Sequence, residues 1–312
     1  MDIIFQVFPY AIAFTIPLLV TALGGLYSER SGVANIALEG LMIIGAFGSA
    51  LSLKILPNNM FSVWLSLGVA TIAGALFSVL HAFASVNLKA NQIISGTAIN
   101  MMAGALTIFL ARNITGSGNI RIPGGFMKVD IPVLSGIPVL GPLFFQNTYY
   151  STWLVLLILI LFSFILYKTK FGLRLRACGE NPHAADAAGV NVAYMRYWGV
   201  LLSGAFSGLG GGIYLVTFSK EFNGGVSGFG FLALAALIFG QWKPLGILGS
   251  TFFFGFATTI SNVSQVIPEL AVIPPMYLKV FPYVVTLLAL VIFSKSSQAP
   301  RASGEPFDQA KR

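Results

Sequence analysis

Solid apolar runs of about 20 residues follow one another along most of the chain. A helix of that length crosses the roughly 30 Å hydrocarbon core of a bilayer, and only helices and closed β-barrels satisfy their backbone hydrogen bonds there. Barrel strands would be alternating segments of about ten residues, which these runs are not. With 56% hydrophobic and 9% charged residues, the sequence predicts an all-α, polytopic protein of the plasma membrane.

We expect one transmembrane domain over residues 1–294 with about eight to ten helices. One apolar window, residues 229–240, is too short to cross the bilayer alone. It is therefore expected to be a half-helix, or to join the next window through the break at Pro244. The nine candidate windows are residues 8–27, 33–53, 62–84, 92–111, 152–167, 194–218, 229–240, 245–262 and 280–293.

Basic residues indicate which side of the membrane each loop faces. With residues 168–196 in the cytoplasm, alternation of the spans places twelve of the 18 Lys and Arg residues on that side, as the positive-inside rule requires. The N-terminus is then outside. Residues 295–312 are polar and lack periodicity, so we expect a disordered cytoplasmic tail. The net charge of +8 is attributed to orientation and anionic lipid headgroups, not to nucleic acid.

A long outer loop is expected at residues 112–150. Residues 113–146 hold six glycines and four prolines with short apolar interruptions. Such a loop is too long for an ordinary connector. It is either a flexible outer loop or a lid that meets a delivery protein.

Residues 168–193 form a compact, basic and helix-forming segment between two apolar windows. Asn181 is expected to cap a short helix that begins at Pro182 and stops at Gly189, because each residue type is favoured at that helix position. The alanines of this helix allow another protein to approach closely. Two interpretations stay open: a docking site for a cytoplasmic partner, or a solvated helix without one.

The sequence lacks the motifs of an enzyme. No Gly-Lys dipeptide occurs, so there is no Walker A loop for ATP, and there is no HExxH, GxSxG or Cys/His cluster. Neither His81 nor His183 has a carboxylate at a spacing that suggests a catalytic pair. The lone cysteine, Cys178, is assigned no role. We therefore expect no enzyme, and no cofactor or metal bound by this chain.

Polar interruptions near the start of the second window indicate a solute pathway. Gly32, Asn35 and Gly40 interrupt the apolar pattern there, and irregular backbone at membrane depth persists only when it is buried in protein or lines a cavity. Glu39 is an ionisable group at the same place, with structural pairing as an equal alternative to solute contact. The candidate pathway residues are Asn35, Glu39, Asn91 and Asn100, and further polar or aromatic candidates are Gln92, Asn262, Gln265, Phe109, Phe218 and Phe222.

Three sequence stretches carry a family likeness. They are SERSGVANIALEGLMIIGAF from Ser28, GLRLRACGENPHAADAAGVNV from Gly172 and ALAALIFGQWKPLGILGS from Ala233. Together they resemble the permease subunits of ABC importers of the ribose and branched-chain amino acid type, and the first stretch is similar to that of the nucleoside branch. The likeness extends over nearly the whole chain, up to Ser294. In the middle stretch, the Glu-Ala-Ala form is replaced by Asn-Pro-His-Ala-Ala.

The resemblance implies a helical fold like that of BtuC or ribose permeases, in which residues 172–189 dock on a separate ATPase subunit that binds ATP and Mg. It also implies a second permease chain, commonly a different one, and a solute-binding lipoprotein outside. Membrane lipid surrounds the chain, and no nucleic-acid partner is expected. The implied function is import of a neutral solute, with nucleosides favoured. The coupling positions are Gly172, Arg174, Arg176, Gly179, Glu180, Asn181, Pro182, Ala184, Ala185 and Gly189.

Other functions stay open at this point. Sugars and branched-chain amino acids are alternative solutes. An ion-coupled secondary transporter would need no docking helix and would place more carboxylates at mid-membrane, where this chain offers only Glu39. A membrane scaffold would not need the polar interruptions of the second window.

Overall fold

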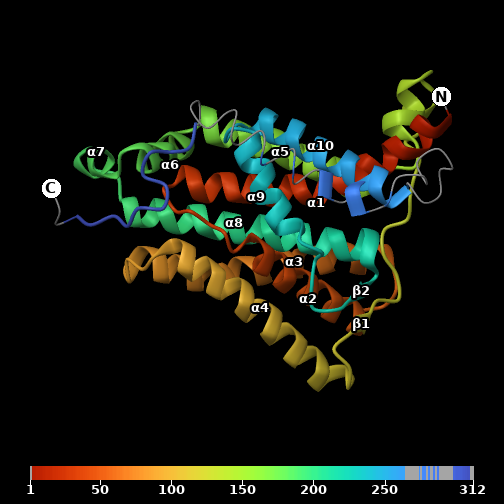
Figure 1. Cartoon of the computed structure of the whole chain (residues 1–312), viewed down its shortest axis with the longest axis horizontal. Coiled ribbons are helices and arrows are strands. Elements are labelled where there is room, and N and C mark those ends of the chain that lie inside the picture. The colour runs from red at the N-terminus through yellow and green to blue at the C-terminus, as the bar shows by residue number, and fades with distance from the viewer. Residues whose placement is uncertain are drawn as a thin grey trace.

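The computed structural model describes residues 2–263, 274, 276–278, 280, 281, 284, 287 and 298–309. Within them, seven helices are long and apolar enough to cross a membrane, which confirms the all-α, multi-pass architecture. Most of them lie side by side along the long axis of the molecule (Figure 1). The predicted span at 280–293 lies largely outside the described residues. The seven long helices are α1 (Asp2–Arg30), α2 (Leu38–Ile55), α3 (Met60–Ala82), α4 (Gln92–Thr115), α5 (Tyr150–Lys168), α8 (Val192–Tyr214) and α10 (Pro244–Val263).

Helix α9 (Phe229–Phe239) is short, as its sequence predicts. At about 1.5 Å per residue its 11 residues reach only about 16 Å, half the hydrocarbon core. Gln241 and Trp242 have positive φ angles of 53° and 51°, so the backbone turns sharply before α10. Of the two expectations, the structure therefore shows a half-helix that is separate from α10.

Helix α8 lies in the centre and packs against α1, α2 and α3. Glycines allow backbone contact there: a Cβ on Gly45 of α2 would lie 2.2 Å from the Gly208 carbonyl oxygen, and one on Gly74 of α3 would lie 2.2 Å from that of Gly204. Small residues at membrane helix interfaces permit this close packing. Two five-residue π-helical turns, Phe83–Asn87 and Leu215–Ser219, extend α3 and α8.

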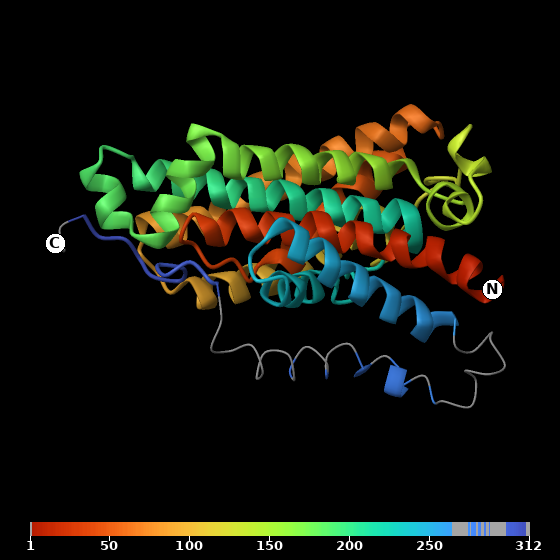
Figure 2. The same cartoon turned by 90° about the horizontal axis from the view of Figure 1, so that it is seen from above.

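The elements predicted to be cytoplasmic gather at one end of the molecule. The short helices α6 (Lys170–Glu180) and α7 (Pro182–Ala187) lie there with the C-terminus, whereas the N-terminus lies at the opposite end (Figures 1 and 2). Arg30 and Glu180 approach to 3.4 Å, and Lys89 and Asp308 to 2.8 Å, so the turns after α1 and before α4 belong to this end. We call it the coupling end.

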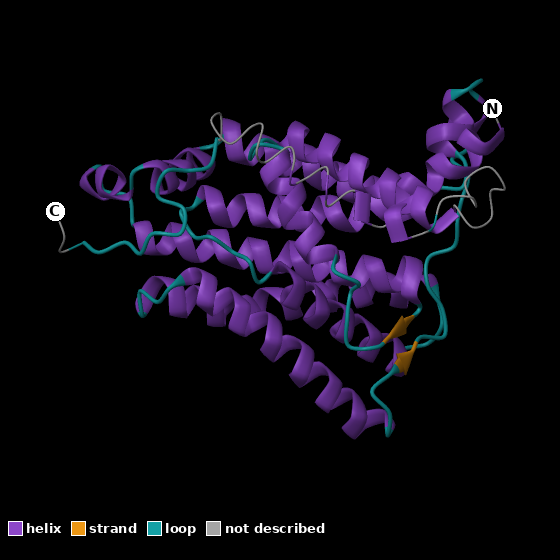
Figure 3. Cartoon of the chain, in the orientation of Figure 1, coloured by secondary structure: helices purple, strands orange, loops and turns teal. Residues whose placement is uncertain are grey.

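The long loop packs onto the opposite end of the bundle. Its strand β1 (Ile120–Arg121) pairs antiparallel with β2 (Glu221–Phe222), the small orange pair in Figure 3. The Phe126 amide donates to the Val216 carbonyl at 3.1 Å, and Phe126 is buried. Short helical turns follow at Leu134–Gly136 and Gly141–Phe145. The loop is therefore attached to the bundle at its start.

The C-terminal residues differ from the sequence-based expectation of a disordered tail. Residues 298–309 pack on the coupling end, and Ala302 is buried. Hydropathy gave no sign of this, because the segment is held by hydrogen bonds, an ion pair and one aromatic ring and not by an apolar run.

Candidate functional site

Residues 31–37 link α1 to α2 as an irregular segment that runs into the bundle; we call it the inner loop. At its start, the Ala34 amide donates to Gln92 Oε1 at 2.7 Å, beside the first turn of α4. Further in, Asn100 Nδ2 donates to the Ile36 carbonyl at 2.8 Å. Gln92 and Asn100 are eight residues apart on α4, which corresponds to a rise of about 12 Å. Helix α2 therefore begins about 12 Å deeper in the bundle than α4. The first five residues of the predicted second window are therefore not helical.

Polar side chains from three helices hold the inner loop. Asn35 Nδ2 donates to Ser203 Oγ at 2.9 Å, and the Gly40 amide donates to Asn100 Oδ1 at 2.7 Å. A ring nitrogen of His81 lies 3.2 Å from the Ala34 carbonyl oxygen. The contacts of Asn100 and His81 satisfy backbone groups that would otherwise be unpaired at membrane depth, as the irregular backbone requires.

Helix α9 also begins inside the bundle, and Glu39 joins it to α2. The Glu39 carboxylate accepts hydrogen bonds from the amides of Gly228 and Gly230, at 2.9 and 2.6 Å, and caps the first turn of α9. Glu39 itself lies in the first turn of α2 and is 8% exposed. Two positive helix ends thus face one carboxylate. The N-termini of two interrupted helices meet at Glu39.

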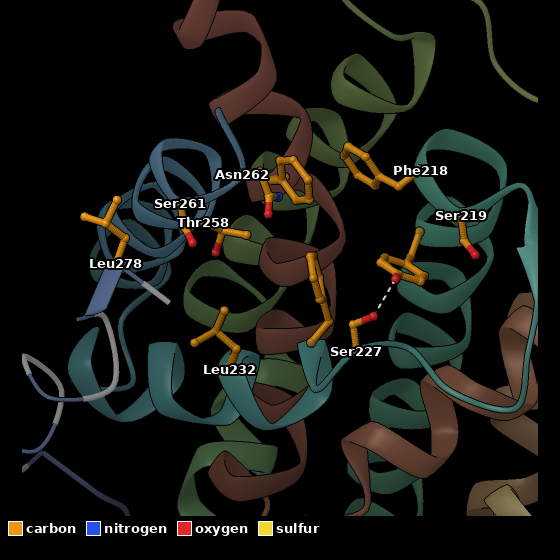
Figure 4. A pocket seen from close by; sticks show the side chains of 11 residues that line it. Phe218, Ser219, Ser227, Leu232, Thr258, Ser261, Asn262 and Leu278 are labelled. Atoms are coloured by element: carbon orange, nitrogen blue, oxygen red, sulfur yellow. Dashed lines mark hydrogen bonds between the residues drawn. The ribbon is translucent and has the colours of Figure 1, made fainter. Parts of the chain in front are cut away.

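A pocket of about 470 Å³ opens beside the start of α9 (Figure 4). Phe14 and Phe218 stack in it with ring centroids 4.2 Å apart. The Tyr214 hydroxyl and Ser227 Oγ are 2.7 Å apart, drawn as the dashed line. Within the described residues the wall holds no Lys, Arg, Asp or Glu, and consists of Phe14, Tyr214, Phe218, Ser219, Ser227, Phe229, Leu232, Thr258, Ser261, Asn262 and Leu278.

The predicted pathway residues take different places around this pocket. Glu39 is not a lining residue, but its carboxylate accepts a hydrogen bond from Gly228, which lies in the chain between the lining residues Ser227 and Phe229. Asn35 and Asn100 hold the inner loop, and Asn91 caps α4 by accepting from the amides of Ile93 and Ile94. Their roles in a solute pathway stay predictions.

Of the further polar and aromatic candidates, Phe218 and Asn262 line the pocket, whereas Phe109 is 62% exposed elsewhere. Gln265 lies outside the described residues. The lining residues Phe14, Tyr214 and Thr258 were not identified from the sequence. They come from α1, α8 and α10, so no local spacing brings them together.

At the coupling end, α7 has the boundaries that the sequence predicts. The Ala184 amide donates to Asn181 Oδ1 at 3.0 Å, and Gly189 follows with a φ of 80°. Only Pro182 and Ala185 of α7 are buried. The exposed residues are His183, Ala184, Ala187 and Ala188. Helix α7 therefore presents a row of small side chains to the solvent.

The predicted coupling positions on α6 face two ways. Gly172 and Gly179 face the bundle: a Cβ on Gly179 would lie 2.3 Å from the Arg30 carbonyl oxygen. Arg176 Nε donates to the Leu166 carbonyl at 3.1 Å, while Arg174 and Glu180 are exposed. One face of this short helix thus packs on the bundle, and the other is exposed to solvent.

One continuous path of contacts joins the coupling end to the pocket. Gly179 of α6 packs on the end of α1, where the inner loop begins. The loop leads to Glu39, which holds the start of α9 beside the pocket. The end of α1 also holds the turn after α9: Glu29 accepts a hydrogen bond from Trp242 Nε1, and Arg30 donates to the Trp242 carbonyl.

Comparison with known proteins identifies the family. Residues 8–290 match the family of branched-chain amino acid transport system permease components. The chain is 48% identical to the guanosine ABC transporter permease protein NupQ of Bacillus subtilis, covering 97% of both chains. It is 43% identical to the nucleoside ABC transporter permease protein NupC of Lactococcus lactis, covering 96% of this chain and 95% of NupC.

A further guanosine ABC transporter permease protein of Bacillus subtilis, NupP, is 25% identical over 74% of this chain and 67% of its own length. The family match and the two relatives above 40% identity extend over nearly the whole chain. They confirm the predicted ABC permease likeness and the predicted absence of an enzymatic role. The chain belongs to the branched-chain amino acid transport system permease family, and is a multi-pass, plasma-membrane transport subunit.

Proposed function

We propose that this permease carries nucleosides through the pocket beside α9. The observation that carries the proposal is the composition of the wall, in which four aromatic rings occur together with hydroxyl and amide groups. A nucleoside has a flat base that stacks on aromatic rings and a ribose that forms hydrogen bonds. The pocket volume lies within the usual range for small-ligand sites, about 300–1,000 Å³. The nucleoside and guanosine names of NupC and NupQ support this solute class.

The charge of the pocket separates the candidate solutes. Its described wall has no charged side chain, which suits an uncharged nucleoside. A zwitterionic amino acid would have to leave water without an ionic partner, which is costly. A sugar would use the hydroxyl groups but has no planar base to stack face to face on the rings.

We propose that a separate ATPase subunit, which binds ATP and Mg, docks on the exposed face of α6–α7. The support is the solvent-facing row of small residues on α7 and the path of contacts from α6 to Glu39. Motion of the coupling segment would move the inner loop, and with it the start of α9 and the pocket wall. Without an ATP motif of its own, the chain needs such a partner.

Two further partners complete the proposed importer. A second permease chain pairs with this one, and two different Bacillus subtilis guanosine permease proteins, NupQ and NupP, both resemble this chain, which supports a pair of unlike chains. A solute-binding lipoprotein delivers the solute at the end that carries β1 and β2, where residues 112–150 pack on the bundle. Lipid covers the remaining apolar surface.

Substitution of Phe218 tests the pocket. Loss of one stacking ring is worth about 1–3 kcal/mol per base, so Phe218→Ala should raise the KM for guanosine uptake about tenfold. Phe109→Ala is the matched control, because Phe109 is exposed and away from the pocket. Unchanged guanosine uptake by Phe218→Ala would place the nucleoside path elsewhere.

Acidic substitutions on α7 test the docking surface. Ala185 is buried, so the double change Ala184→Glu and Ala187→Glu alters the surface without entering the core. We expect ATP-driven uptake to fall about tenfold at normal membrane abundance, because two carboxylates would block close approach. The double change Ala184→Ser and Ala187→Ser is the control, because it keeps both exposed side chains small and uncharged. Parental uptake by the double variant would refute docking at α7.

A further inference from the structure

Residues 298–309 cross the coupling end as a strap with a turn at residues 301–304, which we call the C-terminal strap. The Ala302 amide donates to the Gly179 carbonyl of α6 at 2.9 Å. Arg196 of α8 donates from Nη1 to the Glu305 carbonyl, also at 2.9 Å. The Gln298 amide donates to Gln241 Oε1 at 3.2 Å. The strap is thus tied to α6, to α8 and to the turn between α9 and α10.

Phe307 is the apolar part of the strap and lies between α7 and α8. It packs against a small cluster formed by Cys178, Ala185, Val192 and Met195. Its ring centroid lies 5.1 Å from that of His183. Helix α7 has only six residues and buries only two of them, so it depends on such neighbours for its apolar contacts. Phe307 is one of four partly buried apolar residues that pack against the cluster, and it is the one that comes from the strap.

The end of the strap holds α7 and the turn before α4. Asp308 pairs with Lys89 at 2.8 Å. Gln309 Nε2 lies 3.2 Å from a carboxylate oxygen of Asp186 on α7. The strap therefore connects α7 to the turn before α4.

A buried charge helps to set the position of the strap. Arg196 is 1% exposed, and its Nε and Nη2 atoms have no hydrogen-bond acceptor within the described residues. A buried cation is costly unless its donors are paired. The Glu305 carbonyl satisfies Nη1, and the Phe307 ring lies 6.0 Å from the guanidinium. Displacement of the strap would leave this guanidinium without that acceptor.

From these contacts we propose that the C-terminal strap fixes α7 in the orientation that the ATPase subunit requires, and that ATP-driven transport depends on it. The proposal rests on the docking function proposed above and assigns Phe307 as the main positioning residue. Phe307 acts through α7 and touches no solute. The strap forms one wall of the coupling segment rather than a loose tail.

The rate at which the Cys178 thiol is labelled measures the position of the strap independently of transport. It is the lone cysteine of the chain, is fully buried, and lies in the cluster that Phe307 covers. Burial raises the pKa of its thiol to about 11, which further slows reaction with maleimides because the thiolate is the reactive form. We expect Phe307→Ala, and a chain that ends at residue 297, to raise the Cys178 labelling rate about tenfold in purified permease.

Transport is measured on the same variants, reconstituted with the ATPase, the second permease chain and the lipoprotein. Phe307→Ala should lower nucleoside uptake per ATP hydrolysed about tenfold at normal abundance. Arg301→Gln is the matched control, because Arg301 is exposed on the same strap. It should leave both labelling and uptake unchanged.

Faster labelling with parental uptake per ATP would overturn the proposal, because the strap would cover α6–α7 without serving coupling. Unchanged labelling in the shortened chain would also overturn it, because the strap would not cover Cys178. If the Ala184→Glu and Ala187→Glu variant loses uptake while the strap variants keep it, docking at α7 stands and the strap proposal alone fails.

Discussion

Replacing Glu39 by Gln tests the junction between α2 and α9. The carboxylate accepts two backbone hydrogen bonds, from Gly228 at 2.9 Å and Gly230 at 2.6 Å. Hydrogen bonds to charged groups contribute about 1.5–3 kcal/mol each, and neutral ones about 0.5–1.5 kcal/mol. The amide of Gln keeps one acceptor and turns a donor toward the other N–H. Glu39→Gln should therefore cost about 2–4 kcal/mol, before the lost attraction to two helix N-termini.

The assay for Glu39→Gln is thermal unfolding of the purified permease, together with uptake and membrane abundance. A loss of about 2–4 kcal/mol corresponds to a Tm about 5–10 °C lower for a chain of this size. Uptake should fall as well, because Gly228 lies between two residues that line the pocket. Glu221→Gln is the control, since Glu221 pairs at 3.4 Å with an Arg121 side chain that is 86% exposed, an arrangement worth little.

A parental Tm for Glu39→Gln would refute the capping role. A parental Tm combined with reduced uptake would instead favour Glu39 as a group that contacts the solute. The two roles that the sequence leaves open are thus separated by one variant.

Two other predictions follow from packing and topology. Gly211→Ala should cost about 1–3 kcal/mol and lower membrane abundance, because its Cβ would lie 1.9 Å from the Met42 carbonyl oxygen. Gly104→Ala should be tolerated, because no atom of the described residues lies within 4 Å of the added Cβ. Equal abundance of the two variants would refute the close α2–α8 contact. In a Cys178→Ala background, a cysteine introduced at Lys170 should react with a thiol reagent only from the cytoplasm, and one introduced at Met127 only from outside. Reaction of both from the same side would overturn the orientation. Met127 is chosen because a side chain at the nearby Gly125 would lie 2.2 Å from the Val216 carbonyl oxygen.

Features set by neighbours in sequence were predictable. Asn181, Pro182 and Gly189 predict the start and end of α7, because capping and left-handed termination depend on a few adjacent residues. The shortness of α9 follows from the length of its apolar window. The seven long helices likewise follow from hydropathy, which is a property of each segment by itself.

Features made by distant residues were not predictable. Glu39 is 191 residues from Gly230, and nothing in either segment indicates that one caps the other. The sequence makes Asn91 a pathway candidate, but its helix-capping contact is equally typical of Asn before an apolar run. The strap escapes prediction because its polar composition is that of a disordered segment, while its order depends on Phe307 and on contacts with α6 and α8.

The most direct test of the central claim is uptake of radiolabelled guanosine into proteoliposomes that contain this chain, its ATPase, the second permease chain and the lipoprotein. We expect accumulation that requires ATP and every subunit. Excess unlabelled adenosine or uridine should suppress it, and glucose and leucine should leave it unchanged. Accumulation of labelled glucose or leucine in place of guanosine, or guanosine uptake that continues without ATP and the ATPase, would contradict it.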